Sequence, residues 1–235
     1  MSGERTTVRL FRFDPARDAT PRYVDHCVPY DEHTTVLDLL EHVHEHIEPL
    51  AFHRECRMFK CGICAVNVNG RPALACKARV NQCADRAVLV IEPLACYPVI
   101  KDLMVDFTVD LYDRGNLRAF PEGAATVGAA ATATARESEV LREYTECIRC
   151  GICVEACARV LKNGQEQVNP LHMLDLARLA LDPRDQTDRV LEALGEGLRG
   201  CTECRQCNQV CPVDLDVFEL SIVRLRTMAE DRGLA

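Results

Sequence analysis

The first half of the chain alternates between apolar and polar residues in short runs, the pattern of strands with one buried face. One longer segment breaks this alternation: in residues 34–46 apolar side chains recur at helical spacing behind Thr34 or Thr35, either of which can cap a helix. The dipeptide Asn69-Gly70 is a tight-turn signal and predicts a hairpin. The predicted strands are residues 8–13, 22–29, 65–68, 73–75 and 87–91.

From residue 138 onward the apolar positions follow a helical period throughout. The predicted helices are residues 138–145, 170–181, 188–198 and 213–228. Between the halves, residues 99–114 are amphipathic and predict a connecting helix, and residues 119–135, rich in Ala, Thr and Gly, predict a linker. We therefore expect an α+β chain with a first domain at 1–98, a connecting helix and linker at 99–135, and an all-α domain at 136–235.

Composition narrows the possible classes of protein. The chain has 235 residues, 48% of them hydrophobic, which is enough for a core, and no apolar run is long enough to span a membrane. Its first ten residues lack the apolar segment of a secretory signal. A net charge of −8 without a basic stripe disfavours nucleic acid as a partner. We expect a soluble cytoplasmic protein that other subunits would hold at a membrane.

Fifteen cysteines are far above ordinary usage, and their short repeated spacings favour metal-bound thiolates over disulfides. Cys56-x4-Cys61-x2-Cys64-x11-Cys76 has the plant-type [2Fe–2S] spacing. Gly62, between two of these cysteines, lets backbone amides approach the cluster sulfurs. With its helix and strands, this half of the chain predicts a β-grasp ferredoxin domain. A structural zinc site is the alternative.

The second half contains two copies of C-x2-C-x2-C-x3-C. The first copy is Cys147, Cys150, Cys153 and Cys157, and the second is Cys201, Cys204, Cys207 and Cys211, followed by Pro212. In such pairs three cysteines of one copy hold a cluster and the fourth reaches the neighbouring cluster. The predicted ligand sets are Cys147, Cys150, Cys153 and Cys211 for one [4Fe–4S] cluster, and Cys201, Cys204, Cys207 and Cys157 for the other. Zinc knuckles or a disulfide framework are the alternatives.

Three cysteines lie outside these motifs. Free cysteine commonly behaves as a small buried hydrophobe, so Cys27, Cys83 and Cys96 are interpreted as structural.

Four histidines lie in predicted helices. His42 and His46 are four residues apart and could share a metal, but no acidic third ligand is evident. Because helix surfaces often carry histidine, we expect His42, His44, His46 and His172 to lie on solvated faces.

The sequence has neither a G-x-G-x-x-G nucleotide fingerprint nor a nucleophile signature, so no catalytic residue is predicted. Three clusters in one chain indicate an electron carrier between partners. A structural metal protein or a redox sensor is the alternative from a different class.

The order of motifs resembles the iron–sulfur subunit of the succinate dehydrogenase and fumarate reductase family, over nearly the whole chain. The matching stretches are Cys56-Arg57, Cys61-Gly62-Ile63-Cys64, Asn67-Val68-Asn69-Gly70, Leu74-Ala75-Cys76, Glu92-Pro93-Leu94, Val99-Ile100-Lys101-Asp102-Leu103, residues 144–157 and residues 207–212. The resemblance implies a partner subunit carrying FAD, membrane-anchor subunits and a quinone, with the [2Fe–2S] end facing the flavin. The same build could serve another flavoprotein with a non-quinone donor or acceptor, for example a thiol.

The chain departs from the family pattern around the third cluster. Most members lack a cysteine at the position of Cys204 and hold [3Fe–4S] there, so we expect [4Fe–4S] in this chain, with [3Fe–4S] as the alternative. The family's proline after the ligand matching Cys157 is Ala158. Its quinone-contacting tryptophan is Lys162, and its quinone-side histidine is Thr202. These changes leave open whether an ordinary quinone site exists.

Overall fold

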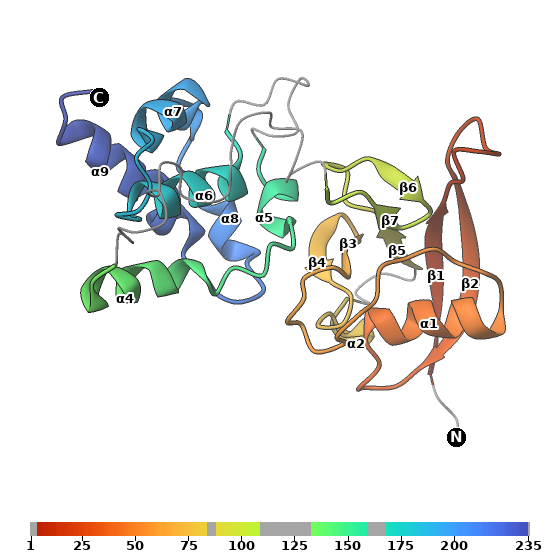
Figure 1. The fold of residues 1–235 in the computed structure, drawn as a ribbon. Helices are drawn as coiled ribbons and strands as arrows, with labels where there is room; N and C mark the ends of the chain where they lie inside the picture. The colour runs from red at the N-terminus through yellow and green to blue at the C-terminus, as the bar shows by residue number, and fades with distance from the viewer. Residues whose placement is uncertain (1–3, 84–87, 109–132, 159–167, 235) are drawn as a thin grey trace, which may run out of the picture. The chain divides into compact units, whose positions relative to one another are not determined.

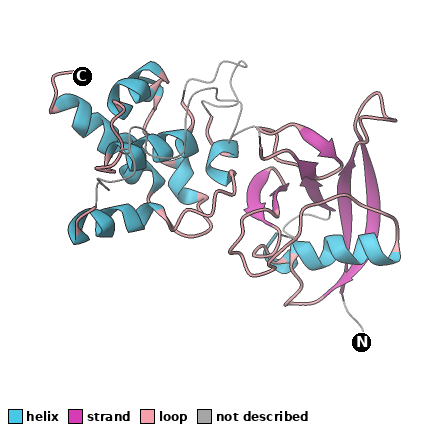
Figure 2. Ribbon diagram, in the orientation of Figure 1, coloured by secondary structure: helices cyan, strands magenta, loops and turns pink. Residues whose placement is uncertain are grey.

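The computed structural model describes residues 4–83, 88–108, 133–158 and 168–234. The chain divides into two compact units. The first comprises Met1–Val109 and Arg149–Ile152, and the second comprises Asp110–Ile148 and Cys153–Ala235. Figure 1 labels the helices and strands in chain order, and Figure 2 distinguishes them by colour.

The first unit is built on a five-stranded sheet in the order β2-β1-β5-β3-β4. Its strands are β1 (Glu4–Arg12), β2 (Arg22–Tyr30), β3 (Ala65–Val68), β4 (Arg71–Leu74) and β5 (Val88–Glu92). Strand β1 pairs antiparallel with β2 and parallel with β5, and β3 pairs antiparallel with both β4 and β5. This mixed sheet with its covering helix is the predicted β-grasp arrangement (Figure 1).

Helix α1 (Val36–His46) lies across the sheet (Figure 1). Of the two predicted caps the chain uses Thr35, whose hydroxyl accepts from the Asp38 N–H while the Asp38 carboxylate accepts from the Thr35 N–H. This reciprocal capping box satisfies two N–H groups at the start of the helix. The apolar face of the helix is buried, with Val36 and Val43 fully covered, so helical spacing in the sequence predicted its inward face correctly.

The predicted connecting helix over residues 99–114 is wrong for its described part. Val99–Lys101 forms β6 and Met104–Val105 forms β7, which pair as a two-stranded sheet. Asp102 lies between them with φ of 47°, and its carboxylate is bound by neighbouring groups, so the chain turns where a helix would continue. Residues 109–114 of that helix, and 119–132 of the predicted linker, lie outside the described residues.

The described part of the second unit contains helices only, in agreement with the all-α prediction. The helices after β7 are α4 (Ala135–Tyr144), α5 (Ile152–Glu155), α6 (Pro170–Ala180), α7 (Arg189–Gly195), η1 (Leu198–Gly200), α8 (Gln206–Gln209), the π-helical segment η2 (Glu219–Val223) and α9 (Arg224–Glu230). A further short helix, α2 (Val80–Cys83), belongs to the first unit.

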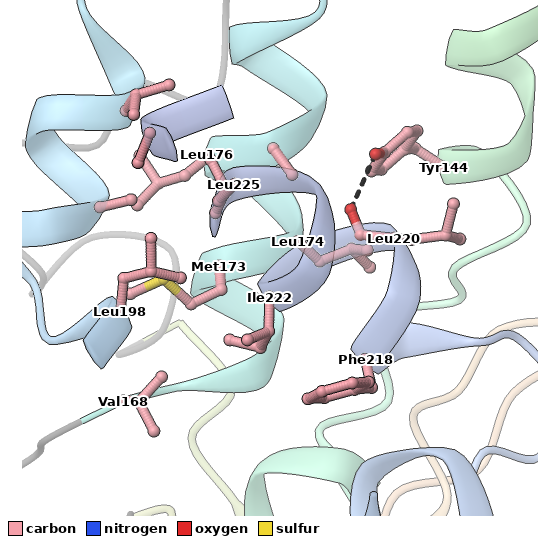
Figure 3. Close-up of a cluster of buried hydrophobic side chains, with 14 residues drawn as sticks. Tyr144, Val168, Met173, Leu174, Leu176, Leu198, Phe218, Leu220, Ile222 and Leu225 are labelled. Atoms are coloured by element: carbon pink, nitrogen blue, oxygen red, sulfur yellow. Dashed lines mark hydrogen bonds between the residues drawn. The ribbon is translucent and has the colours of Figure 1, made fainter. Parts of the chain in front are cut away.

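The core of the second unit joins α6, α7 and the η2–α9 helix (Figure 3). Met173, Leu176 and Leu225 are completely buried there. The Tyr144 hydroxyl donates a hydrogen bond of 2.8 Å to the Leu220 carbonyl, which fixes the end of α4 to η2 (Figure 3).

Several local predictions need correction. His172 is buried rather than solvated, because it lies on the core side of α6. The helix predicted over residues 188–198 ends at Gly195, since Gly197 has φ of 91°. Cys27 is exposed rather than buried, and Cys83 and Cys96 are half-buried. His46 lies on the surface, as expected.

Candidate iron–sulfur centres

The loop from Cys56 to Cys64 turns its backbone N–H groups toward cysteine sulfur. The N–H groups of Met58, Lys60 and Cys61 each lie 3.4 Å from Cys56 Sγ. Donors converging on a sulfur are what a thiolate ligand requires, because N–H groups stabilise its negative charge.

Cys76 completes this group from the end of the β3–β4 hairpin. The Phe59 N–H lies 3.3 Å from Cys76 Sγ, and Cys64 Sγ lies 3.3 Å from the same sulfur. The Ala75 N–H donates to the Cys64 carbonyl at 2.9 Å, so the loop and the hairpin are joined by the backbone as well. The structure thus brings Cys64 beside Cys76 and directs the N–H groups of the loop at Cys56 and Cys76.

The shape of this loop depends on residues with positive φ. Arg57, Phe59 and Gly62 have φ of 57°, 46° and 75°. Only glycine adopts this region without strain, so two strained L-residues mark a conformation that the surroundings impose. Helix α1 supplies one restraint, because Glu41 forms an ion pair with Arg57 at 2.9 Å and accepts a hydrogen bond from Arg54 at 3.5 Å.

The sulfurs of this group differ in acidity. The N–H donors of Met58, Lys60 and Cys61 lower the pKa of Cys56 to about 7. Burial raises the pKa of Cys64 to about 12. A group that includes one readily formed thiolate and a second, buried thiol fits a cluster whose iron ions compensate the buried negative charge.

In the second unit a pocket is lined by Cys157, Cys201, Cys204 and Cys207. These are the four cysteines that the spacing assigned to one cluster, including the single one that comes from the other copy of the motif. The rest of the wall combines apolar side chains, among them Phe218 and Ile222, with polar ones such as Thr202 and Ser221.

The thiols of this pocket influence one another. Burial raises the pKa of Cys207 to about 11, with smaller contributions from the charges of Cys201, Cys157 and Cys204. Burial likewise raises the pKa of Cys201. Four thiols gathered in an apolar pocket disfavour their own ionisation, and bound iron would reverse that preference.

The two cysteine repeats share a backbone conformation around their middle cysteine. In the first copy Arg149 and Gly151 have φ of 54° and 73°, and in the second Glu203 and Arg205 have φ of 59° and 55°. A left-handed residue therefore precedes and follows the middle cysteine in both copies. Consecutive turns of this kind point backbone N–H groups to one side, as anion-binding loops do.

The four predicted ligands of the other [4Fe–4S] cluster are at least partly shielded from solvent, whereas Cys61 of the [2Fe–2S] group is exposed. Cys150 is buried, and Cys147, Cys153 and Cys211 are half-buried. The Leu215 N–H lies 3.4 Å from Cys211 Sγ, so this thiol also receives a backbone donor. Among the described residues, no group of three or more His, Cys, Asp or Glu side chains is arranged to hold a metal ion.

The structure adds four residues that the sequence patterns did not single out. Arg226 on α9 contacts Glu203 and the carbonyl of Cys201, and Phe218 lies beneath Arg205. An arginine on a terminal helix has no characteristic spacing, so only the fold reveals its place beside the cysteine loop.

Two family models match the chain. A 2Fe-2S iron-sulfur cluster binding domain matches residues 7–111, and a 4Fe-4S dicluster domain matches residues 143–215. The fumarate reductase iron-sulfur subunit of Haemophilus influenzae is 32% identical over 226 residues, covering 89% of this chain and 87% of that protein. The chain belongs to this family. It is an iron–sulfur subunit of the fumarate reductase and succinate dehydrogenase type, with one domain that matches [2Fe–2S] binding and one that matches [4Fe–4S] dicluster binding.

A longer relative is also similar. A fumarate reductase (CoM/CoB) subunit of Methanothermobacter marburgensis is 35% identical over 239 residues, covering 96% of this chain. The chain spans 45% of the length of that protein. The iron–sulfur family therefore also includes proteins with segments that this sequence does not contain.

The fold has a counterpart among solved structures. A chain of the Mycobacterium smegmatis Sdh1 complex in the apo form matches with a TM-score of 0.85 at 24% identity, covering 100% of this chain and 99% of that one. Helices of the described ranges do not combine the length and apolar character that crossing a membrane requires.

Proposed function

We propose that the protein is the electron-transfer subunit of a succinate dehydrogenase or fumarate reductase complex, linking an FAD subunit to a quinone through three clusters. The observation that carries the proposal is the pocket formed by Cys157 together with Cys201, Cys204 and Cys207. It joins both motif copies in one site, which the crossed ligand pattern of a two-cluster domain requires. When bound, the clusters accept and donate electrons one at a time.

The proposed ligands follow the spacing. Cys56, Cys61, Cys64 and Cys76 hold [2Fe–2S], Cys147, Cys150, Cys153 and Cys211 hold [4Fe–4S], and Cys157, Cys201, Cys204 and Cys207 hold the third cluster. The chain's part in electron transfer is to fix these sulfurs, to supply N–H donors to them, and to keep water from the buried ones. Removing or adding such donors changes the reduction potential.

The third cluster is proposed to be [4Fe–4S]. Cys204 lines the same pocket as the other three cysteines, and its charge acts on both Cys201 and Cys207. A fourth thiol within reach supports a complete cube rather than a three-iron centre. The alternative, [3Fe–4S], would leave Cys204 unused.

The proposed partners are a flavoprotein subunit and membrane-anchor subunits, with this chain as a peripheral subunit at the cytoplasmic face of the membrane. The fumarate reductase iron-sulfur subunits of Haemophilus influenzae and Wolinella succinogenes support this assignment, because each is covered nearly end to end by the chain, at 87% and 92% of its length.

A second candidate is electron exchange with a non-quinone partner, for example a thiol. It is favoured by the relative whose name specifies CoM/CoB, and by Thr202 in place of the family's quinone-side histidine. Reduction of the isolated complex by a quinol, compared with reduction by a dithiol, separates the two candidates.

Electron paramagnetic resonance (EPR) of anaerobically purified protein tests the central assignment. The native protein should show no [3Fe–4S] signal as isolated and coupled [4Fe–4S] signals after reduction. Cys204→Ala should gain the [3Fe–4S] signal and retain the other two clusters, while Cys27→Ala, a matched cysteine outside the motifs, should match the native spectrum. A four-iron third centre in Cys204→Ala would overturn the ligand assignment.

A further inference from the structure

Cys204 is the most accessible cysteine of its pocket. It is exposed, whereas Cys201 and Cys207 are half-buried and Cys157 is buried. If these four hold a cube, the corner at Cys204 faces solvent, and loss of its iron converts the cube to a three-iron centre. What keeps Cys204 in place therefore decides which cluster persists.

The residues on either side of Cys204 are both strained. Glu203 has φ of 59° and Arg205 has φ of 55°, and neither is glycine. Such conformations persist only where surrounding contacts hold them, because they are unfavourable for an L-residue. The short loop has to be restrained from outside.

Arg226 provides the restraint before Cys204. Its Nη1 donates to the Glu203 carboxylate, and its Nη2 donates to the Cys201 carbonyl at 3.0 Å, with the Leu198 carbonyl 3.4 Å away. One guanidinium thus binds a side chain and two backbone carbonyls of the cysteine loop and of the turn that precedes it. Its neighbour Leu225 is completely buried, so the helix that carries Arg226 is fixed in the core.

Phe218 provides the restraint after Cys204. The Arg205 guanidinium lies over the Phe218 ring at 4.7 Å from its centroid. Phe218 is itself buried, and its N–H donates to Asn208 Oδ1 at 2.8 Å. A cation over an aromatic face is attracted to it, which gives Arg205 a reason to retain its left-handed backbone.

We propose that Arg226, with Glu203, is a positioning residue that holds the Cys204 thiolate on the fourth iron of the third cluster. This inference rests on the proposed four-iron centre and adds the device that maintains it. Glu203 is 61% exposed, so the ion pair contributes little to folding stability. The ion pair should slow the loss of the fourth iron from the cluster and leave the melting temperature nearly unchanged.

Controlled oxidation of the full chain measures that persistence. Each conversion gives one electron to ferricyanide, releases one Fe²⁺ and leaves one [3Fe–4S] centre, so the EPR signal and a ferrous-iron chelator report the same event. Arg226→Ala should convert roughly tenfold faster than the native protein, since it loses an ion pair and the hydrogen bonds to two carbonyls. Arg226→Lys should convert at an intermediate rate. Lysine keeps the positive charge but lacks the paired N–H donors of the guanidinium group.

Arg232→Ala is the matched control. Arg232 follows the same helix and is also ion-paired, but its partner is Asp188 at 2.7 Å, before the start of α7, rather than a residue of the cysteine loop. It should convert at the native rate.

Glu203→Gly removes the carboxylate that Arg226 binds without leaving a strained backbone at position 203. Glycine adopts positive φ freely, so this variant should fold at least as well as the native protein and still convert faster. It also serves if Arg226→Ala fails to fold.

The outcomes distinguish the two proposals. Equal conversion rates for the native protein, Arg226→Ala and Glu203→Gly, with a clean four-iron native spectrum, would overturn the positioning role and leave the proposed function intact. A [3Fe–4S] signal in the native protein before any oxidant is added would overturn the four-iron centre itself.

Discussion

Arg12 donates a hydrogen bond from Nε to Asp102 Oδ1 at 3.0 Å, and the two residues are only 8% and 2% exposed. The Asp102 carboxylate also accepts from the N–H groups of Phe13 at 3.2 Å and Ala51 at 3.0 Å. One carboxylate therefore joins the end of β1, the segment after α1 and the β6–β7 turn. Arg12 also pairs with Glu48 at 2.5 Å through Nη1, so removing the Asp102 charge would leave its guanidinium only partly compensated.

Asp102→Asn should lower the free energy of unfolding by about 2–3 kcal/mol, because Arg12 loses a charged acceptor in a buried site. Asparagine tolerates positive φ, so the loss reports the missing charge and the missing second acceptor oxygen rather than the backbone. Urea denaturation of the protein with its clusters intact gives the measurement.

Asp25→Asn is the control for that change. Asp25 pairs with Arg9 at 2.7 Å on the surface, where both side chains are nearly half exposed. Asp25→Asn should lower the free energy of unfolding by less than about 1 kcal/mol. If both variants lose the same free energy of unfolding, the buried Arg12–Asp102 pair contributes no more than an exposed pair.

Asp102 also explains why the helix predicted from residue 99 onward does not form. Apolar residues in 99–108 recur at helical spacing, but Asp102 with its buried partners forces a turn, and two short strands form instead. Partners such as Arg12 lie about ninety positions away in sequence, so local periodicity contains no trace of them. The strands β1 and β2 and helix α1 were predicted correctly, because their periodicity and caps are local.

The candidate centres also combine features that the sequence indicates with features that it does not. Spacing within each motif copy is local, and the crossing of the fourth cysteine is regular in such pairs, so the sequence indicated that Cys157 would join Cys201, Cys204 and Cys207 in one pocket. The contacts of Arg226 and Phe218 with the cysteine loop depend on how η2 and α9 pack, which periodicity does not encode. The burial of His172 was not predicted, because α6 is covered on nearly all sides by tertiary packing, which its local pattern does not encode.

Phe59→Gly should raise the free energy of unfolding by about 0.5–1 kcal/mol. Phe59 has φ of 46° and is 47% exposed, so glycine relieves backbone strain and gives up little burial. Its N–H to Cys76 Sγ is retained, and the [2Fe–2S] absorption spectrum should not change. Denaturation midpoints and the visible spectrum test both points.

Met58→Gly is the matched control for Phe59. Met58 is the preceding residue and is 62% exposed, but it does not have positive φ. Glycine there should destabilise by about 0.5–1 kcal/mol through loss of chain entropy alone. Stabilisation by both substitutions would contradict the strain at Phe59.

Tyr144→Phe should lower the free energy of unfolding by about 1–2 kcal/mol at neutral pH, because the buried Leu220 carbonyl loses its hydrogen-bond donor at 2.8 Å. Burial raises the pKa of Tyr144 to about 12, above the ordinary value of 10.0. The raised value favours the neutral phenol in the folded state, so its contribution is complete below pH 10 and is lost as the pH rises toward 12.

The phenylalanine variant does not titrate, so the gap between it and the native protein should narrow over that pH range. Thermal melts from pH 8 to pH 11.5 follow the gap. Tyr30→Phe is the control, since Tyr30 bonds Glu4 at 2.7 Å near the surface and should change stability by less than about 0.5 kcal/mol. A constant gap for Tyr144→Phe would rule out its titration as the cause.

Gly151→Ala should destabilise the protein for two separate reasons. Gly151 has φ of 73°, where alanine is strained by about 1–2 kcal/mol. An added Cβ would also lie 2.6 Å from Tyr97 Cε2, and both residues belong to the first unit. Tyr97 is 5% exposed and packs against Phe107 at 5.0 Å between ring centroids, so it cannot move away at low cost.

Gly70→Ala isolates the first of these reasons. Gly70 has φ of 76°, and a Cβ there would meet nothing within 4 Å, so only the backbone strain should be felt. Gly151→Ala should therefore cost at least about 2 kcal/mol more than Gly70→Ala. In a Tyr97→Ala background that excess should disappear, because the ring that the methyl group meets is gone. If the excess remains in the double variant, the added methyl group clashes with a residue other than Tyr97.

Because Gly151 lies between Cys150 and Cys153, iron content measured on the same samples shows whether the altered loop still loads its cluster.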